Sequence, residues 1–144
     1  APWSIPVILN NKIVPYPVAS GNKVPWISHA DLAKFVVSAI EKPELASQVL
    51  PIGGNLYTGE EIAEAIASEI NEPIKFIAMT PDEFEQQITP AFGDLAGKEI
   101  SNLYRYVKEN REELLSKDFK KTQDILDVVP QSLTEWVKSV KWEL

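Results

Sequence analysis

The residue types with the clearest chemical potential stand together in one short segment. His29 is the only histidine of the chain, with Ser28 immediately before it and Asp31 two residues after it. A histidine beside a carboxylate suits proton transfer by general acid–base catalysis. Side chains two positions apart on a helix do not face each other, however, so a catalytic pair is not expected. We therefore interpret Ser28, His29 and Asp31 as the structural start of a helix, with a polar contact facing a cleft as the alternative.

Other reactive groups are either absent or explained by helix starts. The chain has no cysteine, which excludes disulfides, thiolate zinc ligands and cysteine nucleophiles. A lone histidine without a nucleophile motif does not support a Ser-His-acid triad. Glu60, Glu61 and Glu64 lie where a helix is predicted to begin, and carboxylates there stabilise the helix dipole. We predict no catalytic residue and no metal site within these residues.

The glycine pair at Gly53 and Gly54 is the one candidate for a phosphate-binding turn. It follows a predicted strand and precedes a predicted helix, as such turns do. A dinucleotide fold also needs a third glycine and an acidic residue in a following strand, and both are missing here. We therefore predict that this chain alone binds no nucleotide cofactor.

The composition limits the class of protein and its partners. The 144 residues are 44% hydrophobic and 24% charged, which is typical of one globular domain. A net charge of −7 disfavours nucleic acid as a partner. The one basic cluster, at Lys117, Lys120 and Lys121, is interpreted as a solvated loop or helix end. No apolar run approaches the roughly 20 residues of a membrane span, and the first residues lack the features of a signal peptide, so a cytoplasmic location is expected.

Several elements must position these residues. A strand over 23–27, paired as a hairpin with an extended piece over 12–16, is expected to lead into a helix over 31–40. The apolar residues Leu32, Phe35, Val36, Ala39 and Ile40 follow the spacing of one helix face. A further strand is predicted over 48–54.

The second half of the chain is predicted to be mainly helical. Thr58 with Glu61 is spaced as a capping box, so a helix is expected after it, followed by a strand over 74–79. Thr80 and Pro81 are typical of the next helix start. A long helix is expected over 100–114, a looser segment over 120–130, and a final helix from Ser132 with Trp136 in the core.

The first ten residues are rich in proline and apolar side chains. Such a surface is usually covered by other protein. Two interpretations remain open: these residues pack against a preceding part of a longer chain, or they form a short helix on the core of this domain.

Taken together, the order of these signals resembles the NmrA-like branch of the extended, atypical short-chain dehydrogenases. The motifs that carry the resemblance are GNKVPWI at 21–27, DLA at 31–33, GG at 53–54, YTGEEIA at 57–63, PDEF at 81–84, FG at 92–93, and the segments 122–127 and 132–137. The resemblance implies an α/β fold, with few short strands and a predominantly helical remainder. It also implies that residues 1–144 are a single domain, the C-terminal, substrate-side lobe of a longer Rossmann-type protein whose nucleotide-binding half is absent.

The resemblance also suggests where a substrate would bind. Trp3, Tyr16, Trp26 and Phe92 are the substrate-binding residues that it implies. The Tyr-x-x-x-Lys pair of the short-chain dehydrogenases has no counterpart, because Tyr104 and Lys108 occur late in the chain and are interpreted as a helix-surface pair.

The implied function is NAD(P)H-dependent reduction of a small carbonyl or quinone-like acceptor by the longer protein, with the 144-residue chain inactive by itself. Its expected partners are the missing half and a small-molecule substrate, but neither nucleic acid nor a membrane. Assembly into a homo-oligomer remains open. The alternatives are a regulator that senses NAD(P) without turnover and binds a partner protein, and a free-standing interaction module.

Overall fold

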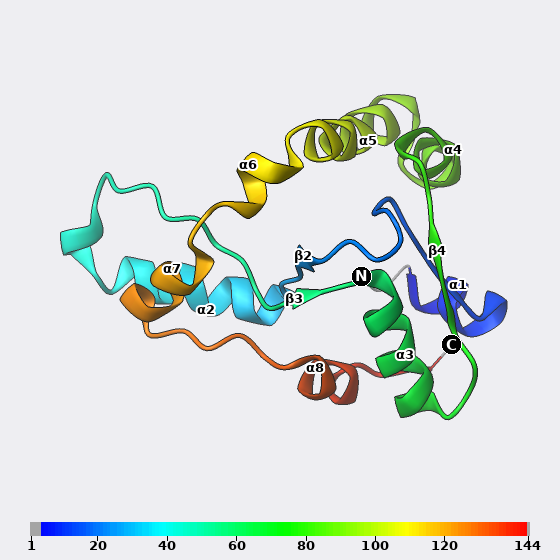
Figure 1. Ribbon diagram of the computed structural model, residues 1–144, viewed down its shortest axis with the longest axis horizontal. Coiled ribbons are helices and arrows are strands. Elements are labelled where there is room, and N and C mark those ends of the chain that lie inside the picture. The colour runs from blue at the N-terminus through cyan, green and yellow to red at the C-terminus, as the bar shows by residue number, and fades with distance from the viewer. Residues whose placement is uncertain (1–3, 144) are drawn as a thin grey trace.

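The computed structural model describes residues 4–143 and is mainly helical (Figure 1). The described elements are α1 Ser4–Asn11, β1 Ile13–Tyr16, β2 Val24–Pro25, α2 His29–Ile40, the 3-10 helix η1 Pro43–Leu45, β3 Leu56–Tyr57, α3 Gly59–Ile70, β4 Lys75–Ala78, α4 Pro81–Phe92, α5 Asp94–Glu109, α6 Arg111–Leu115, α7 Phe119–Leu126 and α8 Leu133–Ser139. Few short strands beside many helices confirm the predicted α/β class. Within residues 4–143, no helix is long and apolar enough to cross a membrane.

The strands pair differently from the sequence-based expectation. β1 is parallel to β4, with Tyr16 opposite Ala78, and β2 is antiparallel to β3. The predicted hairpin between 12–16 and 23–27 is therefore wrong. β1 takes a partner from far along the chain, and Pro15 stands within that pairing opposite Ile77.

Two further predictions need correction. Residues 48–54 run without strand pairing, because no described strand lies beside them; the next strand begins only at Leu56. The segment expected to be loose contains the helix α7. Asp118 caps α7 by accepting the backbone N–H of Lys121 at 2.9 Å, and Asp127 ends it in the left-handed conformation.

Three helix starts are confirmed at the level of their hydrogen bonds. Thr58, Thr80 and Ser132 each form a capping box with the glutamate three residues later. The long predicted helix begins earlier, at Asp94, and is interrupted at Asn110 before α6. Short-range capping thus sets most helix boundaries.

The larger apolar core joins the two ends of the chain. Its buried residues come from α1, β1, α3, the segment before β4, and α8: Ile8, Val14, Ile62, Ala63, Ile66, Ile74 and Val137. Trp136 packs against this core, as predicted. Two interpretations were open for the first ten residues. The part described from Ser4 onward favours a short helix on the core of this domain, because Ile8 of α1 is buried in that core.

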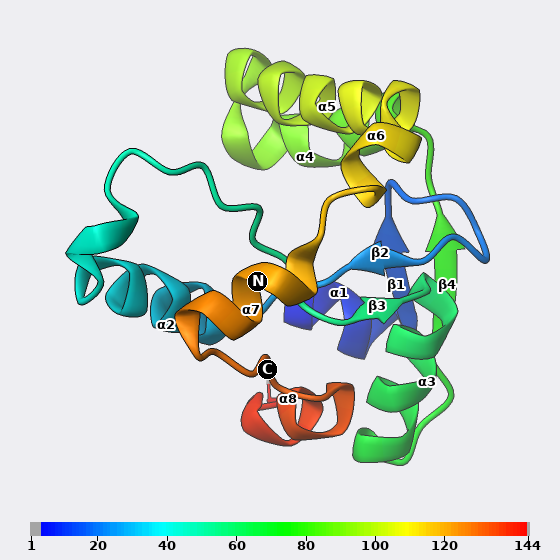
Figure 2. The same ribbon diagram turned by 60° about the vertical axis from the view of Figure 1, so that its left-hand side comes forward.

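A second, smaller core lies between α2 and α7, which run side by side in Figure 2. It is formed by Phe35, Leu126 and Val128, and the ring of Phe35 is fully buried. The Ser38 hydroxyl donates to the carbonyl of Leu126 at 2.5 Å and fixes the pair further. Only one face of α2 is covered in this way.

The helices α4 and α5 form a hairpin that stands to one side of the molecule (Figures 1 and 2). Gly93, with φ +82°, makes the turn between them. The two helices approach closely at Gly97, where a Cβ atom would lie 2.5 Å from the Thr89 hydroxyl. This hairpin and β1 together position the aromatic cluster described next.

Candidate functional site

Tyr16 is the centre of an aromatic cluster at the end of β1. Its ring lies 4.8 Å from Trp26, 5.6 Å from Tyr104 and 6.3 Å from Phe84, measured between centroids. Phe84 and Tyr104 meet edge to face at 5.1 Å. Because Phe84 belongs to α4 and Tyr104 to α5, the cluster joins the helical hairpin to the strands.

Two hydroxyl groups meet inside this cluster. The Tyr16 and Tyr104 hydroxyl oxygens are 2.8 Å apart, and either can be the donor. Burial, together with the neighbouring Tyr104 hydroxyl, raises the pKa of Tyr16 well above its usual value. Tyr16 therefore stays protonated, so the cluster presents a neutral hydrogen-bonding group and no phenolate base.

Trp26 is held by the segments around it. Its indole N–H donates to the carbonyl of Tyr57 at 3.0 Å, and the Tyr57 hydroxyl accepts the backbone N–H of Leu133 at 3.2 Å. Trp26 is thus fixed through β3 to the start of α8. A preorganised ring of this kind suits contact with a flat ligand.

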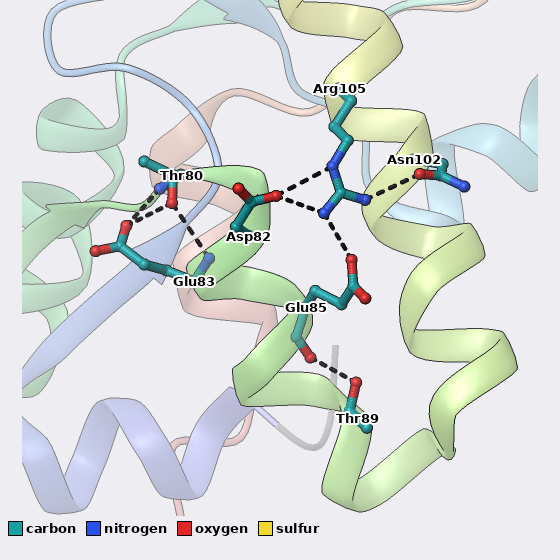
Figure 3. A network of polar contacts seen from close by, with 7 residues as sticks. All are labelled: Thr80, Asp82, Glu83, Glu85, Thr89, Asn102 and Arg105. Atoms are coloured by element: carbon teal, nitrogen blue, oxygen red, sulfur yellow. Dashed lines mark hydrogen bonds and ion pairs between the residues drawn. The ribbon is translucent and has the colours of Figure 1, made fainter.

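Arg105 forms the centre of a polar network on the hairpin (Figure 3). Its Nη2 donates to Asp82 at 2.5 Å and to Glu85 at 2.6 Å, and its Nη1 donates to Asn102 at 2.9 Å. The hydrogen bonds from Arg105 to these carboxylates raise the pKa of the guanidinium. Through these bonds Arg105 links α5 to α4. It is a poor site for an anion, because Asp82 and Glu85 already surround the guanidinium with negative charge.

Ser28, His29 and Asp31, at the start of α2, have a different role from the aromatic cluster. Ser28 is the N-cap and accepts the backbone N–H of Asp31 at 3.0 Å. His29 is exposed at the first helical position. Asp31 is 2% exposed and accepts from the backbone N–H of Gln131 at 3.0 Å and from Lys34 at 2.9 Å.

The environment of Asp31 favours its charged form. Burial pushes the pKa of this carboxyl upward, but the hydrogen bonds from Lys34, Gln131 and Ser28 outweigh burial and lower it. Asp31 therefore works as an ionised tie between α2 and the segment before α8. The link to Gln131 gives Asp31 a long-range role that helix-start reasoning did not foresee.

Of the four residues predicted to bind substrate, Tyr16 and Trp26 share the aromatic cluster. Phe92 ends α4 and is 41% exposed. Trp3 lies outside the described residues. The sequence reasoning missed Phe84 as a member of the cluster and placed Tyr104 on the helix surface. That placement of Tyr104 is wrong, because its ring and hydroxyl both contact Tyr16.

The glycine pair allows close packing. A Cβ on Gly53 would lie 2.7 Å from the ring of Phe119, and a Cβ on Gly54 would lie 1.7 Å from the carbonyl oxygen of Trp26. Only glycine therefore fits at these two positions. Within residues 4–143, no group of three or more acidic or histidine side chains is arranged to hold a metal ion.

Comparison with known proteins places this geometry in context. Residues 8–137 match the model of the NmrA-like family. The chain is 32% identical over 74 residues to an NAD(P)H azoreductase of Xenophilus azovorans, an alignment that covers 51% of this chain and 26% of the azoreductase. Its fold is similar to that of a nucleoside-diphosphate-sugar epimerase of Staphylococcus aureus, with a TM-score of 0.70 and 20% identity, over 94% of this chain and 47% of the epimerase. The matched region is therefore less than half of either relative.

Proposed function

The chain belongs to the NmrA-like family, and on that premise we propose that it is the substrate-side lobe of an NAD(P)H-dependent oxidoreductase that reduces a small carbonyl or quinone-like acceptor. In this proposal a separate nucleotide-binding half completes the protein. Use of NAD(P)H by the azoreductase relative supports the choice of cofactor.

The observation that carries the proposal is that α2 is apolar on two faces. One face bears Phe35 and is covered by α7. On other faces, Leu32, Val36 and Val37 are about half-exposed, and Ile40 is 76% exposed. An apolar helix face is normally covered by other protein, so the uncovered apolar face of α2 fits a partner layer.

The unpaired run before the glycine pair supports the same conclusion. Val49 is 96% exposed and Ile52 is 37% exposed, although this stretch has the composition of a strand. A strand, a helix and a second strand in succession are the unit from which parallel sheets are built. We propose that residues 48–52 pair as a strand with the sheet of the nucleotide-binding half. The uncovered face of α2 then packs against that sheet.

The division of labour follows from the residues present. The reduced nicotinamide supplies the hydride when it is bound, and it would be held by the other half, because the glycine pair here lacks the third glycine and the acidic residue of a dinucleotide fold. This chain contributes the aromatic cluster, which orients a flat acceptor and excludes water from it.

Two measurements test the proposal. An antibody to this chain should detect a native polypeptide about twice its length, as an added domain of ordinary size requires. In that polypeptide, Ile40→Asp should reduce stability by about 2 kcal/mol or more, because it would bury a carboxylate against the partner layer. Leu103→Asp, at a half-exposed position of α5, is the matched control and should have little effect.

The alternatives give different results. A native polypeptide of only this length, with equal effects of the two substitutions, would refute the lobe and favour a free-standing interaction module. A longer polypeptide that binds NADPH but never oxidises it with naphthoquinone or any carbonyl would refute the reductase and favour a sensor without turnover.

A further inference from the structure

We propose that the Tyr16–Tyr104 hydroxyl pair is the polar anchor of the substrate site and that it donates a hydrogen bond to an acceptor oxygen of a planar aromatic ligand. This inference rests on the proposed function, because it names residues and a ligand class for the substrate-side lobe. It adds Tyr104, a residue of α5, to the residues predicted to bind substrate.

The Tyr16 and Tyr104 hydroxyls have one proton more than their mutual hydrogen bond uses. Each tyrosine hydroxyl carries one proton and can accept through its lone pairs. The contact at 2.8 Å uses one of the two protons, because one hydroxyl donates and the other accepts. The accepting hydroxyl keeps its own proton for a third group. Both residues are half-buried, so a ligand can supply that third group.

The protonation state makes this donor durable. Burial and the neighbouring hydroxyl raise the pKa of Tyr16, so the Tyr16 hydroxyl keeps its proton near neutral pH. A neutral donor pairs well with a carbonyl oxygen, which carries partial negative charge and no proton. A carboxylate ligand is less suitable, because Arg105, the cation next to Tyr104 in the sequence, is already paired with Asp82 and Glu85.

The surrounding rings define the shape of the ligand. Phe84 comes from α4, Tyr104 from α5, and Trp26 directly follows β2. Each of these three rings lies within 6.3 Å of the Tyr16 ring, measured between centroids. Aromatic faces and edges stack on flat conjugated molecules. A flat ring that carries a carbonyl oxygen, as a quinone does, combines both features of the site.

The hairpin gives such a ligand a way in. The helices α4 and α5 pack chiefly on each other, and Tyr16 connects them to β1 through Phe84 and Tyr104. A small shift of the hairpin would open the cluster without disturbing either apolar core.

The test is a nitrogen-edited NMR titration of the chain with naphthoquinone, with naphthalene as the ligand that lacks oxygen. The indole N–H of Trp26 is the reporter, since it donates to Tyr57, and its resonance is identified by its loss in Trp26→Phe. The chain has no cysteine that the quinone could alkylate. The key variant is Y16F/Y104F, because it removes both hydroxyls and keeps both rings. Neither hydroxyl is then left without its partner.

We expect saturable binding of naphthoquinone that Y16F/Y104F weakens by about three- to tenfold, the loss of one hydrogen bond. Naphthalene should bind both proteins equally. Tyr106→Phe, on the exposed side of the same helix, should match the original chain. The single variants Y16F and Y104F then identify the hydroxyl that contacts the ligand.

Equal affinity of Y16F/Y104F and the original chain for naphthoquinone would overturn the inference, as would the absence of saturable binding. The titration contains no nicotinamide and no second domain. It therefore gives its answer whether or not the proposed cofactor-dependent reaction exists, and failure of the two-part assembly would leave the NMR result interpretable.

Discussion

Replacement of Asp31 by Asn gives the sharpest test of how this fold is held together. The carboxylate of Asp31 is almost fully buried and accepts from the Gln131 backbone N–H and from Lys34. An amide oxygen can still accept from Gln131, but a hydrogen bond to a charged group is stronger than a neutral one by about 1 kcal/mol. The half-exposed Lys34 ammonium adds about 0.5 kcal/mol, as expected for a solvent-screened pair.

The expected loss of unfolding free energy is therefore about 1.5 kcal/mol, or about 5 °C in Tm for a domain of this size. Asp31→Ala should lose about 3 kcal/mol, because it leaves the Gln131 N–H without its acceptor. The measurement is urea unfolding at neutral pH, followed by far-ultraviolet circular dichroism. Asp94→Asn is the control, since Asp94 is an exposed carboxylate in the first turn of α5.

The pH dependence gives an independent check on the same residue. The pKa of Asp31 is lower in the folded chain than its ordinary value of 3.8, so the unfolded chain takes up the proton first as pH falls. The stabilisation by Asp31 is thus complete above about pH 5 and is lost as pH falls through the folded pKa. The difference between the original chain and Asp31→Asn should shrink toward zero in that range. A difference that is independent of pH, or below 0.5 kcal/mol at neutral pH (about the scatter of surface substitutions), would refute the assigned role of the carboxylate.

Three further substitutions test the packing. Gly54→Ala should destabilise by about 3 kcal/mol or more in thermal unfolding, because its Cβ would lie 1.7 Å from the Trp26 carbonyl oxygen, and a neutral result would mean that this backbone contact is not formed. Gly97→Ala should destabilise by about 1–3 kcal/mol through its clash with the Thr89 hydroxyl; a double-mutant cycle with Thr89→Ala should recover part of that loss, and strict additivity would contradict the clash. Phe35→Ala should lower the unfolding free energy by about 3–5 kcal/mol, since the ring is fully buried between α2 and α7, and a loss under 1 kcal/mol would show that these helices do not pack in solution.

Three helix starts could be predicted because their causes are local. Thr58, Thr80 and Ser132 each bond to a residue three positions away, so the pattern is complete within one turn. The start of α7 was missed because its cap, Asp118, lacks the glutamate that completes a capping box and follows a run of mixed charge.

The candidate site was only half predictable. Tyr16 and Trp26 were expected near a substrate from the family resemblance, and their rings contact each other at a tilt of 46°. The spacing of Ile100, Tyr104 and Val107 places Tyr104 on the apolar face of its helix, but it does not show which residue Tyr104 contacts. Its role depends on the way α5 folds back along α4.

By itself, the sequence determined the helical content, the three capping boxes, the absence of thiol chemistry and the membership of a family, because these depend on residue types and on spacings of a few positions. Only the tertiary structure decided that β1 pairs with β4, that Asp31 holds Gln131, and that the Tyr16 and Tyr104 hydroxyls meet across 88 positions of sequence. Contacts at such separations are set by how whole elements pack and by the entropy of closing long loops. No short window of sequence carries that information.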